Sequence, residues 1–537
     1  MAEVFDSRST RLTLGSTQTT PNGVAGFVPA PRAEELDRSA PADAVVEQEP
    51  SIALPEQAAI PLVARLCQGL RAEGIAYCQF KSNWRLARWL QGEGDLDLLV
   101  ERADAGRFAR LLLELGFKQA RPTRDRQLPG VSDYYGFDEE ARRFVHLHVH
   151  YQLVLGHDLT KNFRLPLERP YLESASRDGL IRTPLVEFEL VLFVLRMVLK
   201  YSLADRVLNR LAGAKKKNAD GATREELAFL EARSARERVE RVVREHLPFV
   251  GVEFFDECVR SLKKDVSTWR RLSVRRELEE RLSTHARRTL ASDEWLKFGR
   301  RAKRLLVERA LRRTARKQLV TGGALIALVG GDGAGKTTAV EGLHAWLSKK
   351  FDARRFHLGK PPRSLLTLAV IVALHLRRRL PGGQKRAGDF PGYLRLLRWV
   401  LASRDRRRLY EQARRYTTNG GVAVCDRFPV ERLRLMDGPN IARMVEPARM
   451  NWLVRRLLAA EERNYRQIME PDVLFVLRVE PEVAVRRKTI ESEEHVRTRS
   501  RELWEQDWTG TRAHVVDAGR PADEVLAHLQ TIVWRNL

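Results

Sequence analysis

The chain has 537 residues, of which 43% are apolar and 31% are charged; this composition is typical of a soluble globular protein and excludes a wholly disordered or collagen-like chain. A chain of this length is expected to form about two to four domains. Lysine and arginine number 95 against 70 aspartates and glutamates, so the net charge of +25 favours anionic ligands such as nucleotides, nucleic acid or acidic lipids.

Cysteine usage and apolar runs bear on the cellular compartment. The four cysteines form no CxxC pair, so neither a disulfide framework nor a zinc–thiolate site is expected. The longest apolar run, Leu365–Leu376, is shorter than the roughly 18–20 residues that span a bilayer. The first residues lack the basic patch and apolar core of a secretory leader. The sequence therefore predicts a cytoplasmic protein.

The first two predicted regions are a tail and a small domain. Residues 1–52 are rich in Ser, Thr, Pro and Ala without apolar periodicity, and we expect a disordered tail. Residues 53–205 mix strand-type and helix-type apolar patterns, which predicts a small α+β domain. The expected strands are 75–80, 96–100 and 144–153, and the expected helices are 58–70 and 104–115.

Residues 206–318 carry few strand signals and are predicted to form a helical connector. Its last part, Phe298–Leu319, sets leucines among arginines. That pattern fits a linker helix, and it also fits contact with an anionic membrane surface or with RNA. We favour the linker helix, and nucleic acid is disfavoured because exposed aromatic residues for base stacking are not evident there. Whether the chain forms a homodimer is left open.

Residues 319–537 alternate buried-type strands with helices. Near-continuous apolar strands separated by helices indicate a parallel sheet that helices cover on both faces. The predicted fold class of this region is therefore α/β, with five strands over residues 324–330, 355–359, 421–426, 473–479 and 514–518.

The strongest motif stands between the first of these strands and a helix, and it matches G-x-x-x-x-G-K-[ST]. Its glycines let backbone N–H groups turn toward phosphate oxygens, and the following helix adds its positive dipole end. The lysine neutralises the β- and γ-phosphates, and the first threonine ligates Mg²⁺. The motif predicts ATP and Mg²⁺ as cofactors, bound by Gly330, Asp332, Gly333, Ala334, Gly335, Lys336, Thr337 and Thr338.

This loop resembles that of thymidylate kinases, which carry an acidic residue where Asp332 stands, followed by Gly-Ala-Gly-Lys-Thr-Thr. A second matching element is Val422–Phe428, because that family ends its third strand in Asp-Arg followed by an aromatic residue or His. The resemblance covers about residues 320–537 and implies a P-loop kinase fold. It implies that Asp426 is an acidic partner of the Mg²⁺ site and that Arg427 binds the acceptor's phosphate.

The resemblance also extends to the lid of these kinases. The helix that begins at Pro481-Glu482 ends in Arg486-Arg487-Lys488, which looks like the entry to a lid whose arginines close over the phosphates. Arg497 and Arg499 suit the same task, and their alternative is an exposed basic helix. A phosphate-binding arginine of the family corresponds to Arg404 or Arg406 here, and the sequence does not choose between them.

The acceptor side departs from the family. After Phe428 the chain has Pro-Val-Glu-Arg-Leu-Arg in place of the serine-containing stretch and Tyr-Gln that hold the thymine ring. Lys360 is followed directly by prolines where the family has Arg-Glu-Pro. The leading hypothesis is in-line phosphoryl transfer to a nucleoside monophosphate, dTMP or similar, as the small-molecule acceptor. The alternatives are a kinase for a sugar or lipid-linked intermediate, and a non-catalytic binding protein switched by nucleotide.

In the first domain, Asp95 and Asp97 stand at i and i+2 of one strand and so share a face, which suits a divalent metal. With Ser82 upstream they resemble the Asp-x-Asp strand of the nucleotidyltransferase superfamily, which implies that they bind Mg²⁺. Lys81 replaces the usual glycine, and the third carboxylate before Leu-His is absent. A second, degenerate transferase activity is therefore kept as a hypothesis.

Three alternating histidines, His146, His148 and His150, follow on a later strand of the same domain. Their period of two places them on one face of the strand. They could ligate a metal, but strand histidines more often serve packing or hydrogen bonding.

Overall fold

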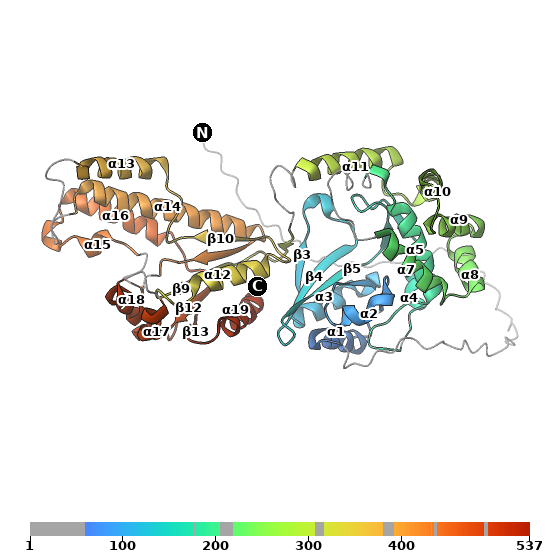
Figure 1. Ribbon diagram of the computed structural model, residues 1–537, viewed down its shortest axis with the longest axis horizontal. Helices are drawn as coiled ribbons and strands as arrows, with labels where there is room; N and C mark the ends of the chain where they lie inside the picture. The colour runs from blue at the N-terminus through green and yellow to red at the C-terminus, as the bar shows by residue number, and fades with distance from the viewer. Residues whose placement is uncertain are drawn as a thin grey trace, which may run out of the picture. The chain divides into compact units, whose positions relative to one another are not determined.

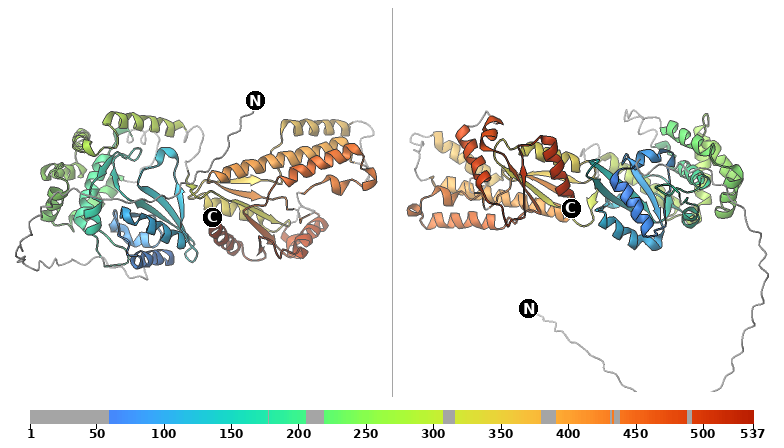
Figure 2. Two further views of the ribbon diagram at one scale, coloured as in Figure 1. Left: turned by 180° about the vertical axis from the view of Figure 1, so that it is seen from behind. Right: turned by 90° about the horizontal axis from the view of Figure 1, so that it is seen from below.

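A computed structural model describes residues 59–176, 178–204, 219–306, 316–379, 391–430, 432–433, 438–487 and 492–537. The tail predicted over residues 1–52 lies outside this part. The described residues form a mixed α/β structure with a six-stranded, a five-stranded and a two-stranded sheet (Figures 1 and 2). Among them, no helix combines the length and the apolar character that crossing a bilayer would need.

The N-terminal part of the chain contains the six-stranded sheet. Its strands are β1 (Tyr77–Gln79), β2 (Asp95–Val100), β3 (Lys118–Arg121), β4 (Val131–Asp138), β5 (Arg143–His150) and β8 (Gln318–Leu319). They lie in the order β1-β2-β5-β4-β3-β8. β2 and β5 run parallel and the other neighbours antiparallel. The sequence predicted β1, β2 and β5 and missed the other three.

One face of this sheet is apolar, and the other carries a group of acidic and histidine side chains. Helices α1 (Pro61–Ala72), α2 (Leu86–Leu90) and α3 (Ala105–Glu114) share a core with alternate residues of β2 and β5. Those strand residues are Leu96, Leu98, Val100, Val145, Leu147 and Val149. Successive strand residues point to opposite faces, so the aspartates of β2 and the histidines of β5 lie on the other face. Short 3-10 turns η2 (Asn83–Arg85), η3 (Arg102–Asp104) and η4 (Arg124–Arg126) join these elements.

A helical region follows the sheet, as the sequence predicted from Glu187 onward. The hairpin β6 (Leu153–Leu155) and β7 (Phe163–Leu165) leads into it. α5 (Val186–Lys200) is buried along most of its length because α7 to α10 surround it. The remaining elements are α4 (Glu168–Glu173), α7 (Ala219–Glu231), α8 (Arg236–His246), α9 (Val252–Leu262), α10 (Thr268–Arg281), η5 (Ser283–His285) and α11 (Leu290–Leu305).

The five-stranded parallel sheet predicted for the C-terminal part is confirmed. Its strands are β9 (Leu325–Gly330), β10 (Ala353–His357), β11 (Val422–Asp426), β12 (Val473–Arg478) and β13 (Ala513–Asp517). They lie in the order β10-β11-β9-β12-β13, and every neighbouring pair is parallel. The chain therefore leaves the central strand β9 for one half of the sheet and returns later to the other half.

Helices cover both faces of this sheet, which explains its continuous apolar strands. Residues Ile326 and Leu328 of β9 pack with α12 (Lys336–Leu347) and α19 (Ala522–Asn536). Leu325 and Ala327 pack on the opposite face with α14 (Tyr393–Thr418). The other elements are α13 (Leu365–Arg379), α15 (Ile441–Met444), η7 (Pro447–Arg449), α16 (Trp452–Arg466), α17 (Pro481–Arg487) and α18 (Glu493–Glu505).

Candidate functional site

The loop between β9 and α12 (residues 330–335, here the glycine loop) is held in a conformation that glycine favours. Gly333 and Gly335 have φ of +80° and +71°. A Cβ at Gly333 would lie 2.7 Å from the Ala484 carbonyl oxygen, so α17 packs directly on the loop. Gly335 is the N-cap of α12 and supplies no side-chain cap. The first N–H groups of α12 are therefore presented toward the loop, where an anion would be stabilised.

Lys336, the lysine that the motif predicts to bind phosphate, lies against the glycine loop. Lys336 is buried, and its Nζ donates a hydrogen bond of 2.6 Å to the Gly331 carbonyl oxygen. Thr337 and Thr338 follow in the first turn of α12 and are exposed. The structure thus places the ammonium and two hydroxyl-bearing residues at the C-terminal end of the central strand. Ligands of open parallel sheets bind at this edge where the chain direction switches sides.

Asp426 and Arg427 end the neighbouring strand at the same edge. Asp426 is paired in register with Leu328 of β9. Its Oδ1 atom is buried and has no hydrogen-bond partner among the described residues. An unpaired buried carboxylate oxygen is suited to a divalent cation, so Asp426 fits the predicted Mg²⁺. Arg427 adopts a left-handed φ of +59°, which is strained for a residue with a side chain.

Asp332 connects the glycine loop to two other elements. Its Oδ2 accepts a 2.9 Å hydrogen bond from Arg499 Nη1 in α18, and its Oδ1 lies 3.6 Å from Arg427 Nη2. Burial alone would raise the pKa of Asp332, but the hydrogen bond from Arg499 and the nearby positive charges lower it below its ordinary value. One ionised carboxylate therefore joins the loop, the end of β11 and α18.

The other predicted lid arginines, unlike Arg499, are not hydrogen-bonded to the glycine loop in the described part of the chain. Arg487 donates to the carbonyl oxygens of Ala518 and Gly519 after β13, at 2.8 and 3.3 Å. Arg486 is exposed at the end of α17, and Lys488 lies outside the described residues. Of the predicted arginines in α17 and α18, Arg499 is the one that the structure joins to the glycine loop by a hydrogen bond.

Arg406 is distinguished from Arg404 by its surroundings. Arg406 is buried, donates to the carbonyl oxygens of Leu358 and Gly359 at 2.8 and 3.3 Å, and bonds the Tyr465 hydroxyl. Leu358 and Gly359 directly follow β10, so Arg406 lies at the strand ends that carry Asp426. Arg404 is half-buried on the same helix.

The sequence analysis missed Glu461, which shapes the same region. This buried carboxylate accepts hydrogen bonds from the backbone N–H groups of Asn440 and Ile441, at 3.0 and 2.9 Å. Tyr465, one turn later on α16, donates to the Gly438 carbonyl oxygen at 3.1 Å. These bonds hold the start of α15 against α16. A glutamate at an otherwise apolar helix position was the signal available in the sequence.

The polar face of the six-stranded sheet carries a second group of functional side chains, here the Asp–His face: Asp95, Asp97, Asp133, His146, His148 and His150. Asp95 lies opposite His146 in the strand register, and Asp97 lies opposite His148. Asp95 Oδ1 lies 2.6 Å from His146 Nδ1, and Asp97 Oδ1 lies 3.0 Å from His148 Nδ1. The two predicted metal aspartates are therefore each paired with a histidine.

Asp133 of β4 joins this face and was missed, because β4 was not predicted. Its Oδ1 lies 2.9 Å from His146 Nε2 and 2.9 Å from Lys317 Nζ. Although burial would raise the pKa of Asp133, the hydrogen bond from His146 and the charge of Lys317 lower it to about 2. Burial would also raise the pKa of Asp97, but Lys81, whose Nζ lies 2.7 Å from Oδ1, and the hydrogen-bonded His148 together lower it below its usual value.

The serine that resembled the nucleotidyltransferase turn is also placed. Ser82 has a left-handed φ of +60°, and its hydroxyl donates to Glu226 at 3.2 Å. The neighbouring Asn83 bonds Glu189 through its backbone and side chain. In this structure the turn after β1 is thus tied to α5 and α7.

The fold and the loop together define a mixed α/β protein with a glycine loop suited to an anion. Comparison with known proteins finds distant similarity to ATP-binding proteins. No family model matches the chain. The chain is 26% identical over 221 residues to the "Uncharacterized ATP-binding protein YghR" of Escherichia coli strain K12, over 39% of this chain and 86% of that protein. The protein of the same name from Escherichia coli O6:H1 strain CFT073 matches equally.

Proposed function

We propose that this chain is an ATP-dependent phosphotransferase that moves the γ-phosphoryl group of ATP to a nucleoside monophosphate, dTMP or a similar one. The observation that carries the proposal is the position of Asp332, which joins the glycine loop, Arg427 and Arg499. A kinase needs three groups close together: the loop that binds ATP, a cationic side chain that binds the acceptor's phosphate, and the lid. In-line phosphoryl transfer requires them because it depends on alignment and charge neutralisation. The Escherichia coli relatives, which are named as ATP-binding proteins, support the ATP part of the proposal.

Each group has a role that follows from its place. The N-terminus of α12 and Lys336 bind the phosphates of ATP, and Lys336 exchanges its bond to Gly331 for one to a phosphate oxygen. Thr337 and Asp426 would hold Mg²⁺, which would neutralise charge on the transferred group. Arg427 binds the acceptor's phosphate, and Arg499 adds positive charge from the lid side.

The test is ADP production from ATP and Mg²⁺ across a panel of nucleoside monophosphates and sugars. We expect a nucleoside monophosphate to stimulate it, and K336A and R427A each to lower the stimulated rate by about 100-fold or more. The matched control is K349A, an exposed lysine just beyond the far end of α12. ATP binding without stimulation by any acceptor would refute the kinase and favour a nucleotide-switched binding protein.

A second acceptor class, a lipid-linked phosphate, is favoured by α13. This helix follows β10 and is anchored by Asp405, which accepts from Ser364 N–H and Thr367 Oγ1 at 3.0 and 2.6 Å. Its other side exposes a continuous apolar stripe. The stripe consists of Leu365, Leu366, Leu368, Val372 and Leu376, with exposed fractions of 85, 56, 42, 56 and 59%. On a chain with net charge +25, such a stripe suits an anionic membrane surface.

Vesicle sedimentation at low salt separates this second candidate from the first. We expect the chain to bind vesicles that contain anionic lipid and not neutral ones, and L368E and V372E to lose binding. The matched control is L113E, which alters an exposed leucine of α3. Equal binding by all three variants, or none by the unaltered chain, would remove the membrane-bound acceptor and leave the soluble one.

A further inference from the structure

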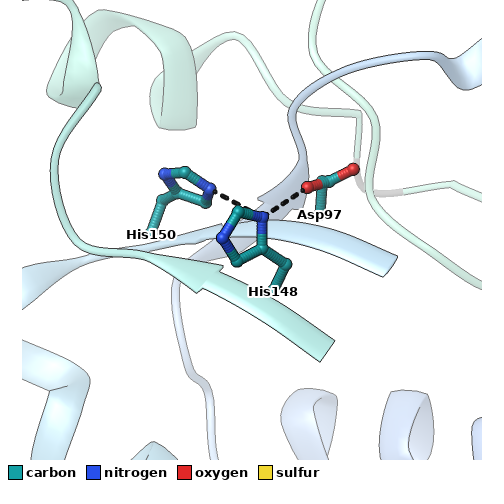
Figure 3. Close-up of side chains that lie close together, drawn as sticks. All are labelled: Asp97, His148 and His150. Carbon is teal, nitrogen blue, oxygen red and sulfur yellow. Dashed lines mark hydrogen bonds and ion pairs between the residues drawn. The ribbon is translucent and has the colours of Figure 1, made fainter. Parts of the chain in front are cut away.

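Three side chains of the Asp–His face converge on one point. Asp97 comes from β2, and His148 and His150 come from the adjacent parallel strand β5 (Figure 3). One ligand atom from each lies within 4.8 Å of the other two. His148 Nδ1 stands in the middle, 3.0 Å from Asp97 Oδ1 and 3.3 Å from His150 Nε2. Three Lewis bases thus lie side by side, and a proton on His148 Nδ1 can form a good hydrogen bond to only one of its two neighbours at a time.

These distances match a tetrahedral metal centre. Bonds of about 2.0–2.1 Å at tetrahedral angles separate neighbouring donor atoms by roughly 3.3 Å. Of the two separations from His148 Nδ1, the one to His150 Nε2, 3.3 Å, equals that value, and the one to Asp97 Oδ1, 3.0 Å, is slightly shorter. The backbone sets them, because Asp97 and His148 are register partners and His148 and His150 share a strand face. An ion could therefore be held without rearrangement of the sheet.

The ligand types indicate the class of ion. Mg²⁺ and Ca²⁺ prefer oxygen ligands, whereas two imidazoles and one carboxylate suit a borderline divalent transition metal. We propose that Asp97, His148 and His150 form a binding site for a divalent transition ion of the Zn²⁺ class. The proposal does not depend on the proposed kinase function, and its ligand set is not the Mg²⁺ pair that the sequence suggested. Asp95 is outside it, bonded to His146.

The surroundings fit such a site. The ring of Phe80 packs edge-on against His150 at 4.7 Å between centroids, which fixes the orientation of a buried ligand. Lys81 Nζ contacts Asp97 Oδ1 itself at 2.7 Å, so it holds the carboxylate in place and would share that oxygen with the ion. The side chains of Lys81 and His148 are 23 and 29% exposed. Solvent therefore reaches the group at these two side chains, and water or a phosphate-type anion could complete the coordination of a bound ion.

The experiment is metal titration of the full chain after chelator treatment and dialysis. Co²⁺ is added and followed by its visible absorption, and Zn²⁺ is then added in competition. We expect one ion per chain with a tetrahedral Co²⁺ spectrum, displacement by Zn²⁺ and no displacement by excess Mg²⁺. D97N, H148Q and H150Q should each weaken binding by about 100-fold or more. The matched control is H146Q, which alters a histidine of the same strand outside the group and should bind normally.

Two readouts keep the outcome decisive. Circular dichroism shows whether each variant is folded, and X-ray absorption of the Zn²⁺-loaded unaltered chain counts imidazole ligands without any substitution. Two imidazoles and no sulfur would support the site. Absence of a bound ion in the unaltered chain, a spectrum without imidazole, or equal loss in H146Q and H148Q would overturn it.

Discussion

Replacing Asp133 by asparagine tests the electrostatics of the Asp–His face. The amide keeps the shape of the carboxylate and can still accept hydrogen bonds from His146 and Lys317, so the change removes mainly the charge. The pKa of Asp133 falls from the ordinary 3.8 to about 2. At about 1.4 kcal/mol for each tenfold change, the folded state gains roughly 2–3 kcal/mol at neutral pH from this carboxylate.

The sign of the pH dependence follows from the lowered pKa. The stabilisation is complete above pH 3.8 and is lost as the pH falls toward 2, because the folded state then takes up the proton that the unfolded chain already carries. D133N should therefore be less stable than the unaltered chain at pH 7 and should approach it near pH 2. Roughly 2–4 °C per kcal/mol for a domain of 150–250 residues gives a fall in melting temperature of about 5–10 °C.

The assay is a thermal melt of both proteins at several pH values, with D256N as the matched control. Asp256 pairs with Arg236 at 2.7 Å on the surface of the helical region, and Arg236 is 69% exposed. Such a pair contributes only about 0–1 kcal/mol, so D256N should melt within a few degrees of the unaltered chain. Equal melting of D133N and the unaltered chain at pH 7, or a difference that grows below pH 4, would refute the reasoning.

Three further predictions concern the C-terminal part, and melting temperature checks each. G333A and G335A both place a Cβ at a left-handed φ, at a cost of roughly 1–2 kcal/mol. Only the Cβ of G333A would also meet the backbone of Ala484, so G333A should melt at a lower temperature than G335A. Equal melting temperatures would contradict this contact. R427G should melt above R427A, because only glycine relieves the φ of +59°. L343A should cost about 2–5 kcal/mol, since Leu343 is a fully buried residue of α12 that packs against the sheet.

The parallel sheet could be predicted because its physical signal is strong. A strand with helices on both faces must be apolar at consecutive positions, and Leu325–Gly330 is buried at all of its residues. The glycine loop was predictable for a related reason: few residues other than glycine tolerate the backbone of positions 333 and 335. In both cases the requirement is local, so a short stretch of sequence carries it.

The missing strands of the first sheet depend on tertiary pairing. Lys118–Arg121 is short and mostly polar, and Gln318–Leu319 has two residues, so neither has an apolar period of its own. They become strands because neighbours offer them backbone hydrogen bonds. Asp133 was missed with β4 for the same reason, since it can be assigned to the Asp–His face only once β4 is known to lie beside β5.

The choice among arginines shows why the site could not be completed from the sequence. Arg486, Arg487, Arg497 and Arg499 have the same chemistry, and spacing alone does not say which reaches the loop. The structure separates them by partner: Arg487 binds carbonyl oxygens after β13, whereas Arg499 binds Asp332. An ionised carboxylate in the loop selects one arginine by geometry, and that selection depends on how α17 and α18 pack over Gly331 and Gly333. Substituting Asp332 by asparagine would weaken this selection while leaving every arginine in place, so the packing of α18 on the glycine loop, more than the loop itself, should respond to it.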